Sequence, residues 1–483
     1  MTEGPNPKSK KQPELYSTSL ERPQSALEEL PLFGWRRAAT GGGGTPESAV
    51  SESQEFAASE RKRVLAQDLM EQVVDRRNFW RAYKRVRANK GSAGVDGMTV
   101  NELLDWLKTH YQALKKSLLD GSYRPSPVRG VQIPKASGGM RQLGIPTALD
   151  RLIQQAIHQV LSPIWEPKFS ESSFGFRPER SAHDAIRQAS AYVGEGRSTV
   201  VDFDLEKFFD RVNHDILMSR LARHIGDRRL LRLIRRFLQA GMMEGSATRP
   251  RREGTPQGGP LSPLLSNILL DDLDKELERR GHCFVRYADD CNVYVRSRAA
   301  GERVMRSVVA FLSLRLRLRV NPEKSAVARV WERKFLGYRL LPGGKVGIAL
   351  ASKKRCVKRL RAITKRNRGV SLPSVVKEVN NFLIGWITYF RLGTARKWIR
   401  DLAGWLRRRL RCYRIKQLKW NFSIYRFLRA HGVNSPMAWH CVLRQKGWWR
   451  RSASPAANHA MPTGWFAELG LIDPYQRYTA LQG

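Results

Sequence analysis

Two adjacent aspartates, Asp289 and Asp290, have the setting that most clearly predicts chemistry in this chain. They separate two short runs rich in Val, Phe and Tyr, residues 283–287 and 291–295, and this pattern predicts strand, tight turn and strand. Two carboxylates about 4 Å apart repel each other by roughly 4 kcal/mol at an effective dielectric near 20. The tip is therefore a candidate seat for a divalent metal, although an isolated Asp-Asp pair is more often a solvated turn.

A second acidic segment shifts that balance. Residues 200–210 read Val-Val-Asp-Phe-Asp-Leu-Glu-Lys-Phe-Phe-Asp, a strand-like start followed by acids and an aromatic pair. If Asp204 ends a strand beside the hairpin, its carboxylate converges with those of Asp289 and Asp290. Such a triad can hold two Mg²⁺ ions, one activating a hydroxyl and one neutralising a triphosphate.

The same segment holds two rival acids, Asp202 and Asp210. Alternate residues of a strand share a face, so spacing does not separate Asp202 from Asp204. Asp210 follows the aromatic pair, where we expect it to cap the next helix rather than to bind a metal.

Several ordered motifs place these acids in a family. Tyr-Ala-Asp-Asp at 287–290, Asp-Leu-Glu-Lys-Phe-Phe at 204–209 and Gly-Thr-Pro-Gln-Gly-Gly-Pro at 254–260 resemble the palm of a reverse transcriptase of the kind encoded by group II introns. Ile-Pro-Lys at 133–135 and the run 138–146 resemble the fingers. Further matching motifs lie at 150–155, 173–178, 181–183, 321–324 and 334–338. The resemblance extends from about residue 61 to the C-terminus.

The resemblance implies an α+β fold: a right-hand polymerase with fingers and palm, an α-helical thumb or maturase domain, and a small C-terminal DNA-binding segment. It implies an RNA-directed DNA polymerase and maturase that promotes splicing and copies the intron into cDNA during retrohoming by nucleotidyl transfer. Two Mg²⁺ ions and dNTP substrates are expected, with group II intron RNA and target DNA as partners. The expected parts are a disordered tail, fingers and palm, thumb, and C-terminal segment, at 1–60, 61–350, 351–420 and 421–483.

The resemblance also assigns catalytic roles. Asp204 and Asp289 would hold both metals, Asp290 would be the supporting acid, and Tyr287 would pack near the primer end. The family pattern selects Asp204 rather than Asp202, because Asp204 opens the Asp-Leu-Glu-Lys-Phe-Phe motif.

Five residues are expected around the incoming nucleotide. Phe209 would occupy the place of a ribose 2′ hydroxyl and so favour dNTP over rNTP, while Phe208 is expected in the core. Gln257 would flank the nucleotide, and the glycines after it would permit close backbone approach. Lys135 and Arg141 would hold the triphosphate or, alternatively, contact the template. Lys324 matches the lysine proposed to protonate the departing pyrophosphate.

The charge of the chain indicates a polyanionic partner. Lys and Arg total 86 against 44 Asp and Glu, a formal charge of +42. The excess is concentrated: residues 351–420 carry 21 basic and 2 acidic residues, whereas residues 1–60 carry 6 and 9. Dense positive charge binds phosphate backbones in a salt-dependent way, which argues against an ordinary small-molecule enzyme.

Residues 351–420 are expected to be helical, with aromatic stripes that include Trp386, Trp398 and Trp405. We interpret these tryptophans as helix-bundle core rather than base-stacking residues. The cationic residues on the other faces are the expected RNA-binding group: Lys353, Lys354, Arg355, Arg407, Arg408, Arg409 and Arg411.

Residues 421–483 combine aromatic and basic side chains. This composition fits a nucleic-acid groove and a small helical core with a basic surface equally well. The expected DNA-binding residues are Lys446, Trp448, Trp449, Arg450 and Arg451. Since paired cysteines for an HNH endonuclease are missing, we expect the primer for DNA synthesis to come from another source.

The remaining features of the sequence mostly exclude other classes of protein. Five scattered cysteines form no CxxC pair, and no apolar run reaches the length of a membrane span. We expect a cytoplasmic protein that is nucleoid-associated when it targets DNA. A splicing cofactor with a relic polymerase, or a retron, diversity-generating or CRISPR-linked reverse transcriptase, is the alternative. The oligomeric state stays open, with one monomer per intron RNA as one arrangement.

Overall fold

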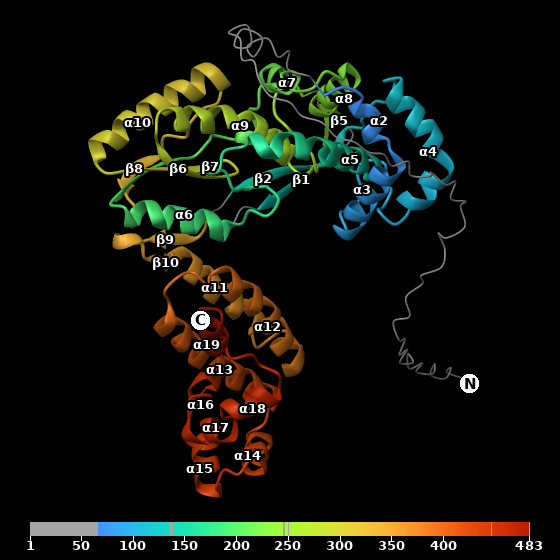
Figure 1. The fold of residues 1–483 in the computed structure, drawn as a ribbon. Coiled ribbons are helices and arrows are strands. Elements are labelled where there is room, and N and C mark those ends of the chain that lie inside the picture. Colours follow the sequence, from blue (N-terminus) through green and yellow to red (C-terminus); the bar gives the residue numbers. More distant parts are fainter. Residues whose placement is uncertain (1–65, 135–138, 245–246, 250, 446, 483) are drawn as a thin grey trace, which may run out of the picture. The chain divides into compact units, whose positions relative to one another are not determined.

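The computed structural model describes residues 66–134, 139–244, 247–249, 251–445 and 447–482, all within one compact unit, Arg63–Gly483 (Figure 1). The disordered tail expected at 1–60 lies outside the described residues. Among the described helices, none has both the length and the apolar character needed to cross a bilayer.

A four-stranded antiparallel sheet positions the acidic motifs. Its strands lie in the order β6 (Cys283–Tyr287), β7 (Asp290–Val295), β3 (Thr199–Phe203) and β8 (Ala326–Arg329). Val, Phe and Tyr dominate β3, β6 and β7, as expected for strands covered on both faces.

Helices cover both faces of this sheet. On one face Val201, Phe203 and Val293 join a core with α9 (Ser262–Arg279) and α10 (Arg298–Phe311). On the other face Val285 and Tyr294 pack with α6 (Ala182–Gly194). Figure 1 shows α10 and α9 on one side of the strands and α6 on the other. Side chains therefore alternate between two cores, as the period of a strand requires.

A second four-stranded sheet belongs to the region expected to form the fingers. Its strands lie in the order β2 (Met140–Ile145), β1 (Val128–Pro134), β4 (Met242–Glu244) and β5 (Ala247–Arg249). The helices of this half of the chain are α2 (Leu69–Val73), α3 (Arg76–Ala88), α4 (Leu103–Leu119), α5 (Ala148–Trp165), α7 (His214–Ala222) and α8 (Arg228–Gln239). Several begin with a side-chain cap; at α3 the carboxylate of Asp75 accepts from the amides of Arg77 and Asn78.

The C-terminal part is helical after one hairpin of β9 (Tyr338–Leu340) and β10 (Val346–Ile348). Its helices are α11 (Leu350–Ile363), α12 (Leu372–Tyr389), α13 (Arg396–Gln417), α14 (Asn421–Ala430), α15 (Ser435–Trp439), α16 (Trp448–Arg451), α17 (Pro455–Ala460), α18 (Thr463–Glu468) and α19 (Pro474–Ala480). Trp386, Trp398 and Trp405 pack against the core that these helices share, so their interpretation as bundle residues is confirmed.

That core is continuous from the sheet to the last helix, since it includes Val285 of β6, Tyr338 of β9, Leu383 of α12 and Tyr478 of α19. The α+β architecture with a helical C-terminal part agrees with the expected fold class. The expected boundaries near 350 and 420 fall at helix starts but inside one compact unit, and they stay a prediction.

Candidate functional site

The hairpin expected around the two aspartates is present. Tyr287 lies opposite Asp290, so Ala288 and Asp289 alone form the turn. Ala288 has φ 60°, the left-handed region that tight two-residue hairpin turns use at their first position. The backbone of Gly175 lies against this turn, because a Cβ on Gly175 would stand 2.2 Å from the nitrogen of Ala288. The prediction of strand, turn and strand is confirmed.

A buried arginine fixes the turn to helix α9. The guanidinium of Arg286 in β6 is fully buried, and its Nε donates to Oδ1 of Asp274 at 2.7 Å. Its Nη1 donates to the carbonyl of Ala288 at 3.0 Å and to Oδ1 of Asn267 at 2.9 Å. Asn267 in turn donates to the carbonyl of Gly175 at 2.8 Å. One helix therefore holds both the turn and the segment that packs behind it.

Sequence reasoning missed this network, although a signal was present. Arg286 is the single charged residue of β6, between Val285 and Tyr287. A guanidinium at a buried strand position needs an acidic partner, because an unpaired buried charge is costly. The partner, Asp274, stands on α9 twelve residues earlier, where the sequence offers several acids and does not select one.

Asp204 lies beside the hairpin, as expected. It follows the pair Phe203 and Cys291 in the register of β3 with β7, which brings it level with Asp290. Its amide donates to Oγ of Ser325 at 2.9 Å, so the loop before β8 holds its backbone. Opposed residues of neighbouring strands share a face of the sheet, so Asp204 and Asp290 lie on the same face.

The carboxylates are close enough to act on one another. The pKa of Asp290 is raised to about 7, first by burial and then by the negative charges of Asp202, Asp289 and Asp204. At neutral pH, in the absence of a bound cation, a substantial fraction of this carboxyl group is protonated. Burial and the neighbouring carboxylates both disfavour a negative charge on Asp290.

The two rival acids have other surroundings. Asp202 accepts a hydrogen bond from Nε of Arg333 at 2.8 Å, and burial is the main cause that raises the pKa of Asp202. Asp210 is exposed in a single 3₁₀ turn, Phe208–Asp210. The expectation that Asp210 caps the next helix is wrong. The cap of α7 falls on Asn213, which accepts from the amide of Ile216 at 3.0 Å.

The carboxylates of Asp204, Asp289 and Asp290 suit a divalent cation chemically, but they are not arranged as a complete metal site. The described part of the chain contains no group of three or more His, Cys, Asp or Glu side chains placed together to hold a metal. Instead, Nζ of Lys324 lies 3.5 Å from Oδ2 of Asp204. Carboxylate oxygens are the ligands that Mg²⁺ prefers, and Asp290 lies buried beside the negative charges of Asp202, Asp289 and Asp204. The role of Lys324 at the pyrophosphate stays a prediction.

The residues expected around the nucleotide are only partly brought together. Phe209 is half-buried at 5.2 Å from the ring of Phe208, and Phe208 is in the core, as expected. The carbonyl of Gln257 accepts from the amide of Gly144 at 3.0 Å, which joins this loop to β2. Gly258 has φ 131°, and a Cβ on it would lie 2.7 Å from the Gly144 carbonyl oxygen. The backbone of Gly258 therefore packs closely on β2, whereas its approach to a nucleotide stays a prediction.

Two of the five nucleotide residues cannot be placed. Lys135 lies outside the described residues. Arg141 belongs to β2 opposite Ile133, but its side chain is not among those that the structure describes. Tyr287 is half-buried and packs on the core shared with the C-terminal helices, so its place near a primer end stays a prediction.

The arginines of α13 expected to bind RNA have internal partners. Arg409 donates from Nε to Oγ1 of Thr364 at 2.6 Å, and Arg411 donates to the carbonyl of Met461 at 3.0 Å. Arg408 stacks on Trp449 at 4.0 Å, and Arg407 lies 3.9 Å from Asp473. These side chains tie α13 to its neighbours, which the sequence analysis did not anticipate.

The group on α11 is more accessible. Lys354 and Arg355 are exposed, and Lys353 lies over the ring of Trp398 at 5.5 Å. RNA binding by the α11 and α13 groups together stays a prediction.

The expected DNA-binding residues lie in and beside α16. Trp448 is flanked by Lys416 and Arg451, at 5.4 and 5.3 Å from its ring. Arg451 also donates to the carbonyl of Val442 at 2.8 Å. These contacts favour the small helical core over a nucleic-acid groove for Trp448 and Arg451. Arg450 is exposed, Trp449 is half-exposed, and Lys446 lies outside the described residues.

Two family models match the chain. Residues 133–340 match "Reverse transcriptase (RNA-dependent DNA polymerase)", and residues 353–431 match "Group II intron, maturase-specific domain". The first range contains the aspartates and the sheet that carries them. The second begins within α11 and ends directly after α14.

The chain is also similar to several known proteins. It is 36% identical over 287 residues to Protein YkfC of Escherichia coli (strain K12), which covers 51% of this chain and 75% of that protein. It is 40% identical over 198 residues to the group II intron-encoded protein LtrA of Lactococcus lactis subsp. cremoris, covering 41% of this chain and 33% of LtrA. A putative COX1/OXI3 intron 1 protein of Saccharomyces cerevisiae is 34% identical over 199 residues, 41% of this chain and 24% of the yeast protein.

Proposed function

This chain belongs to the reverse transcriptase and maturase family of group II introns, and on that basis we propose that it copies intron RNA into DNA at the aspartate cluster of its four-stranded sheet. Enzymes of this family use a divalent metal and dNTPs. The proposal further includes the intron RNA as a stable partner, whose splicing the protein promotes, and a target DNA into which the copy is made.

The observation that carries the proposal is the meeting of two distant acidic motifs at one end of the sheet. Asp204 stands level with Asp290, and Asp289 occupies the adjoining turn. The turn is fixed by Arg286 and cannot drift easily, because a fully buried ion pair anchors it. Catalysis by positioning requires such fixed geometry.

Each residue has a distinct proposed task. Asp204 and Asp289 would hold two Mg²⁺ ions, with Asp290 as the supporting acid. Bound there, these ions would activate the primer 3′ hydroxyl and stabilise the leaving pyrophosphate. Phe209 would exclude a ribose 2′ hydroxyl, and Gln257 would flank the incoming nucleotide.

The proposed tasks of the remaining side chains concern charge and position. Lys324 would leave Asp204 and turn to the pyrophosphate once a metal compensates that carboxylate. Lys135 and Arg141 would hold the triphosphate, and Tyr287 would pack near the primer end. Lys354 and Arg355 are the exposed members of the group predicted on α11 to bind RNA, and they would contact its phosphates.

Primer extension on an RNA template tests this proposal. Wild type with Mg²⁺ and dNTPs should extend the primer, whereas Asp289→Asn should lose extension by at least about 100-fold, since it removes a proposed metal ligand. RNA affinity, measured by fluorescence anisotropy, should stay near the wild-type value in the variant. Extension at the wild-type rate by Asp289→Asn would remove this residue from the site.

A further inference from the structure

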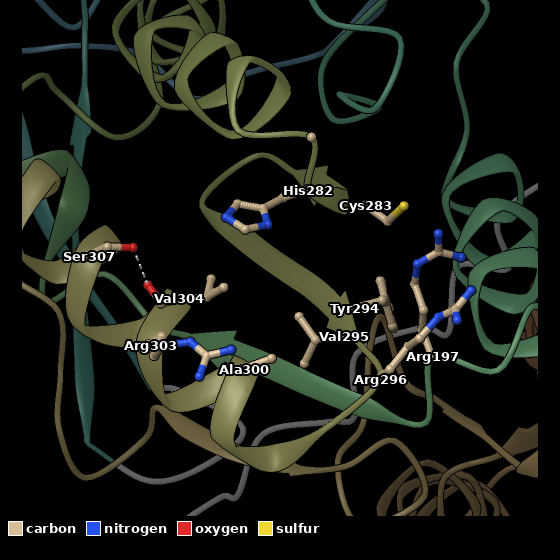
Figure 2. A pocket seen from close by; sticks show the side chains of 11 residues that line it. Arg197, His282, Cys283, Tyr294, Val295, Arg296, Ala300, Arg303, Val304 and Ser307 are labelled. Atoms are coloured by element: carbon tan, nitrogen blue, oxygen red, sulfur yellow. Dashed lines mark hydrogen bonds between the residues drawn. The ribbon is translucent and has the colours of Figure 1, made fainter.

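A cavity of about 500 Å³ opens at the other end of the same sheet (Figure 2). Cys283 begins β6 there and Val295 ends β7, whereas the aspartates lie at the turn between the two strands. Four residue steps along β6 separate Cys283 from Tyr287, roughly 14 Å at 3.4 Å per residue. This cavity, called the rear pocket below, is therefore separate from the proposed catalytic centre.

Cationic side chains converge on the rear pocket. Arg197 precedes β3, Arg296 follows β7 and Arg303 stands on the flank of α10, and all three line the cavity. Figure 2 shows Arg197 and Arg296 together at one side and Arg303 on the α10 wall, with His282 facing them. Burial lowers the pKa of His282, so its imidazole is neutral at pH 7 and acts as a hydrogen-bonding group.

Of the three arginines on this wall, two lack an acidic partner among the described residues. Arg197 forms an ion pair with Glu195, but in the described residues neither Arg296 nor Arg303 has an acid within ion-pair distance. The nearby Glu302 is engaged by Arg298 at 3.0 Å. Two uncompensated guanidinium groups at the mouth of a cavity favour an anionic ligand.

The floor of the rear pocket is apolar. Tyr294, Val295 and Val304 line it, and all three are buried. The cavity volume lies within the usual range for small-ligand sites, about 300–1,000 Å³. A ligand that fits this combination has an anionic group for the arginines at the mouth and a flat apolar group for the floor. A nucleotide within a polynucleotide has both: a phosphate and a base.

We propose that the rear pocket binds one phosphate-bearing nucleotide of single-stranded RNA, at a point outside the polymerase cleft. The proposal rests on the proposed function, since RNA is the polyanion that a reverse transcriptase and maturase must hold. Arg296 and Arg303 bind the phosphate, and the base covers Val295 and Val304. RNA that runs past the sheet is thereby anchored on the protein without entering the catalytic centre.

Cys283 provides a local probe. It lines the rear pocket and is half-buried, whereas the other four cysteines are buried. Alkylation of Cys283 by N-ethylmaleimide in the full chain, followed by mass spectrometry of its peptide, reports access to the pocket. A single-stranded RNA of about 30 nucleotides should slow this alkylation several-fold. Alkylation at an unchanged rate with saturating RNA would overturn the proposal.

A matched pair of double variants separates the pocket from bulk charge. Arg296→Ala/Arg303→Ala should lose the protection of Cys283. The slope of log affinity for single-stranded RNA against log salt should become shallower by about 0.7 for each phosphate that this variant no longer binds. Arg306→Ala/Arg315→Ala removes the same charge from exposed residues that do not line the pocket, and it should keep the protection. Equal loss of protection in both double variants would overturn the proposal.

Two further arms identify the ligand and its independence from catalysis. Inorganic phosphate alone should protect less than RNA, because it lacks the base; equal protection by phosphate would overturn the assignment to a nucleotide. Arg296→Ala/Arg303→Ala should still extend a primer on a short template. If RNA protects Cys283 of the wild-type protein but the protein does not extend primers, only the polymerase proposal fails. If the protein extends primers but RNA does not protect Cys283, only the proposal for the rear pocket fails.

Discussion

The two ends of the four-stranded sheet carry opposite charge and hold it in different ways. At the aspartate end, Asp289 and Asp290 belong to a turn that the fully buried Arg286 fixes to Asp274, and Asp204 lies beside it. At the other end, called the arginine end, Arg296 and Arg303 are exposed and, in the described residues, have no acidic partner. The same side-chain type therefore serves as an internal brace at one end and as an uncommitted surface cation at the other.

This difference indicates how to read a strongly basic sequence. Charge counts place many arginines together on α13, yet Arg409 and Arg411 donate their hydrogen bonds to the protein itself. The arginines that remain available to a phosphate are those whose donors have no internal acceptor. Fixed geometry suits the transfer of a nucleotide, whereas flexible exposed side chains suit the holding of a polymer with many conformations.

The same substitution at both ends gives the largest expected contrast. Arg286→Met leaves Asp274 buried without its partner, and breaking a buried pair in this way costs about 3–5 kcal/mol of unfolding free energy. Arg303→Met changes an exposed side chain, and surface changes stay within about 0.5 kcal/mol. Chemical denaturation of the two variants beside wild type measures the difference. Equal stability of the two would mean that the Arg286 pair is not the brace described.

The Arg286→Met variant alone does not separate folding from positioning, because loss of stability alone can abolish activity. The double variant Arg286→Met/Asp274→Leu removes both charges and should recover most of the stability, since buried pairs are often replaceable by apolar residues. It still lacks the hydrogen bond to Ala288. We expect a folded protein with a reduced kcat for extension and a nearly unchanged KM for dNTP. Wild-type kcat in this variant would show that the turn holds without Arg286.

Two close-packed glycines provide a smaller contrast. A Cβ on Gly175 would lie 2.2 Å from the backbone nitrogen of Ala288, so Gly175→Ala must displace the turn that carries Asp289. A misplacement of about 1 Å at a reaction centre costs on the order of 100-fold in rate. A Cβ on Gly301 of α10 would instead lie 2.5 Å from a methyl group of Val327.

We expect Gly301→Ala to lower stability by about 1–3 kcal/mol through overpacking. Its extension rate should stay near the wild-type value, since α10 packs on the arginine end of the sheet. Thermal unfolding and primer extension on both glycine variants measure the two effects. A larger loss of rate in Gly301→Ala than in Gly175→Ala would contradict the assignment of chemistry to the turn.

Local sequence patterns were sufficient to predict the strands and the turn that carry the aspartates. Alternation with period two placed Asp202 and Asp204 on one face of a strand, and the residues around Asp289 predicted the hairpin. The tryptophan stripe predicted the helical core at Trp386. These features depend on neighbours within a few positions, which a sequence displays directly.

The sequence did not predict which side chains pair across long distances in the chain. Arg409 finds its acceptor at Thr364, and Lys324 finds Asp204, because tertiary packing brings them together. Nothing in the local sequence of a basic helix distinguishes a guanidinium that binds a carbonyl from one that stays exposed. For the same reason the brace at Arg286 and the cavity near Arg303 became visible only in the fold.

The smallest expected effect concerns the acid that sequence spacing could not exclude. Asp202 shares the strand face of Asp204, but its carboxylate is held by Arg333 at 2.8 Å. Asp202→Asn keeps the shape of the side chain and weakens one partly exposed ion pair, which is worth about 0.2–1 kcal/mol. We expect primer extension to fall less than tenfold, a change of about 1.4 kcal/mol.

Asp204→Asn provides the comparison, since it should lose extension as severely as Asp289→Asn. If Asp202→Asn were the inactive variant and Asp204→Asn the active one, the metal seat would lie two residues earlier, within β3. The pair of variants therefore decides which of the two carboxylates binds the metal. The ion pair between Asp202 and Arg333 favours Asp204.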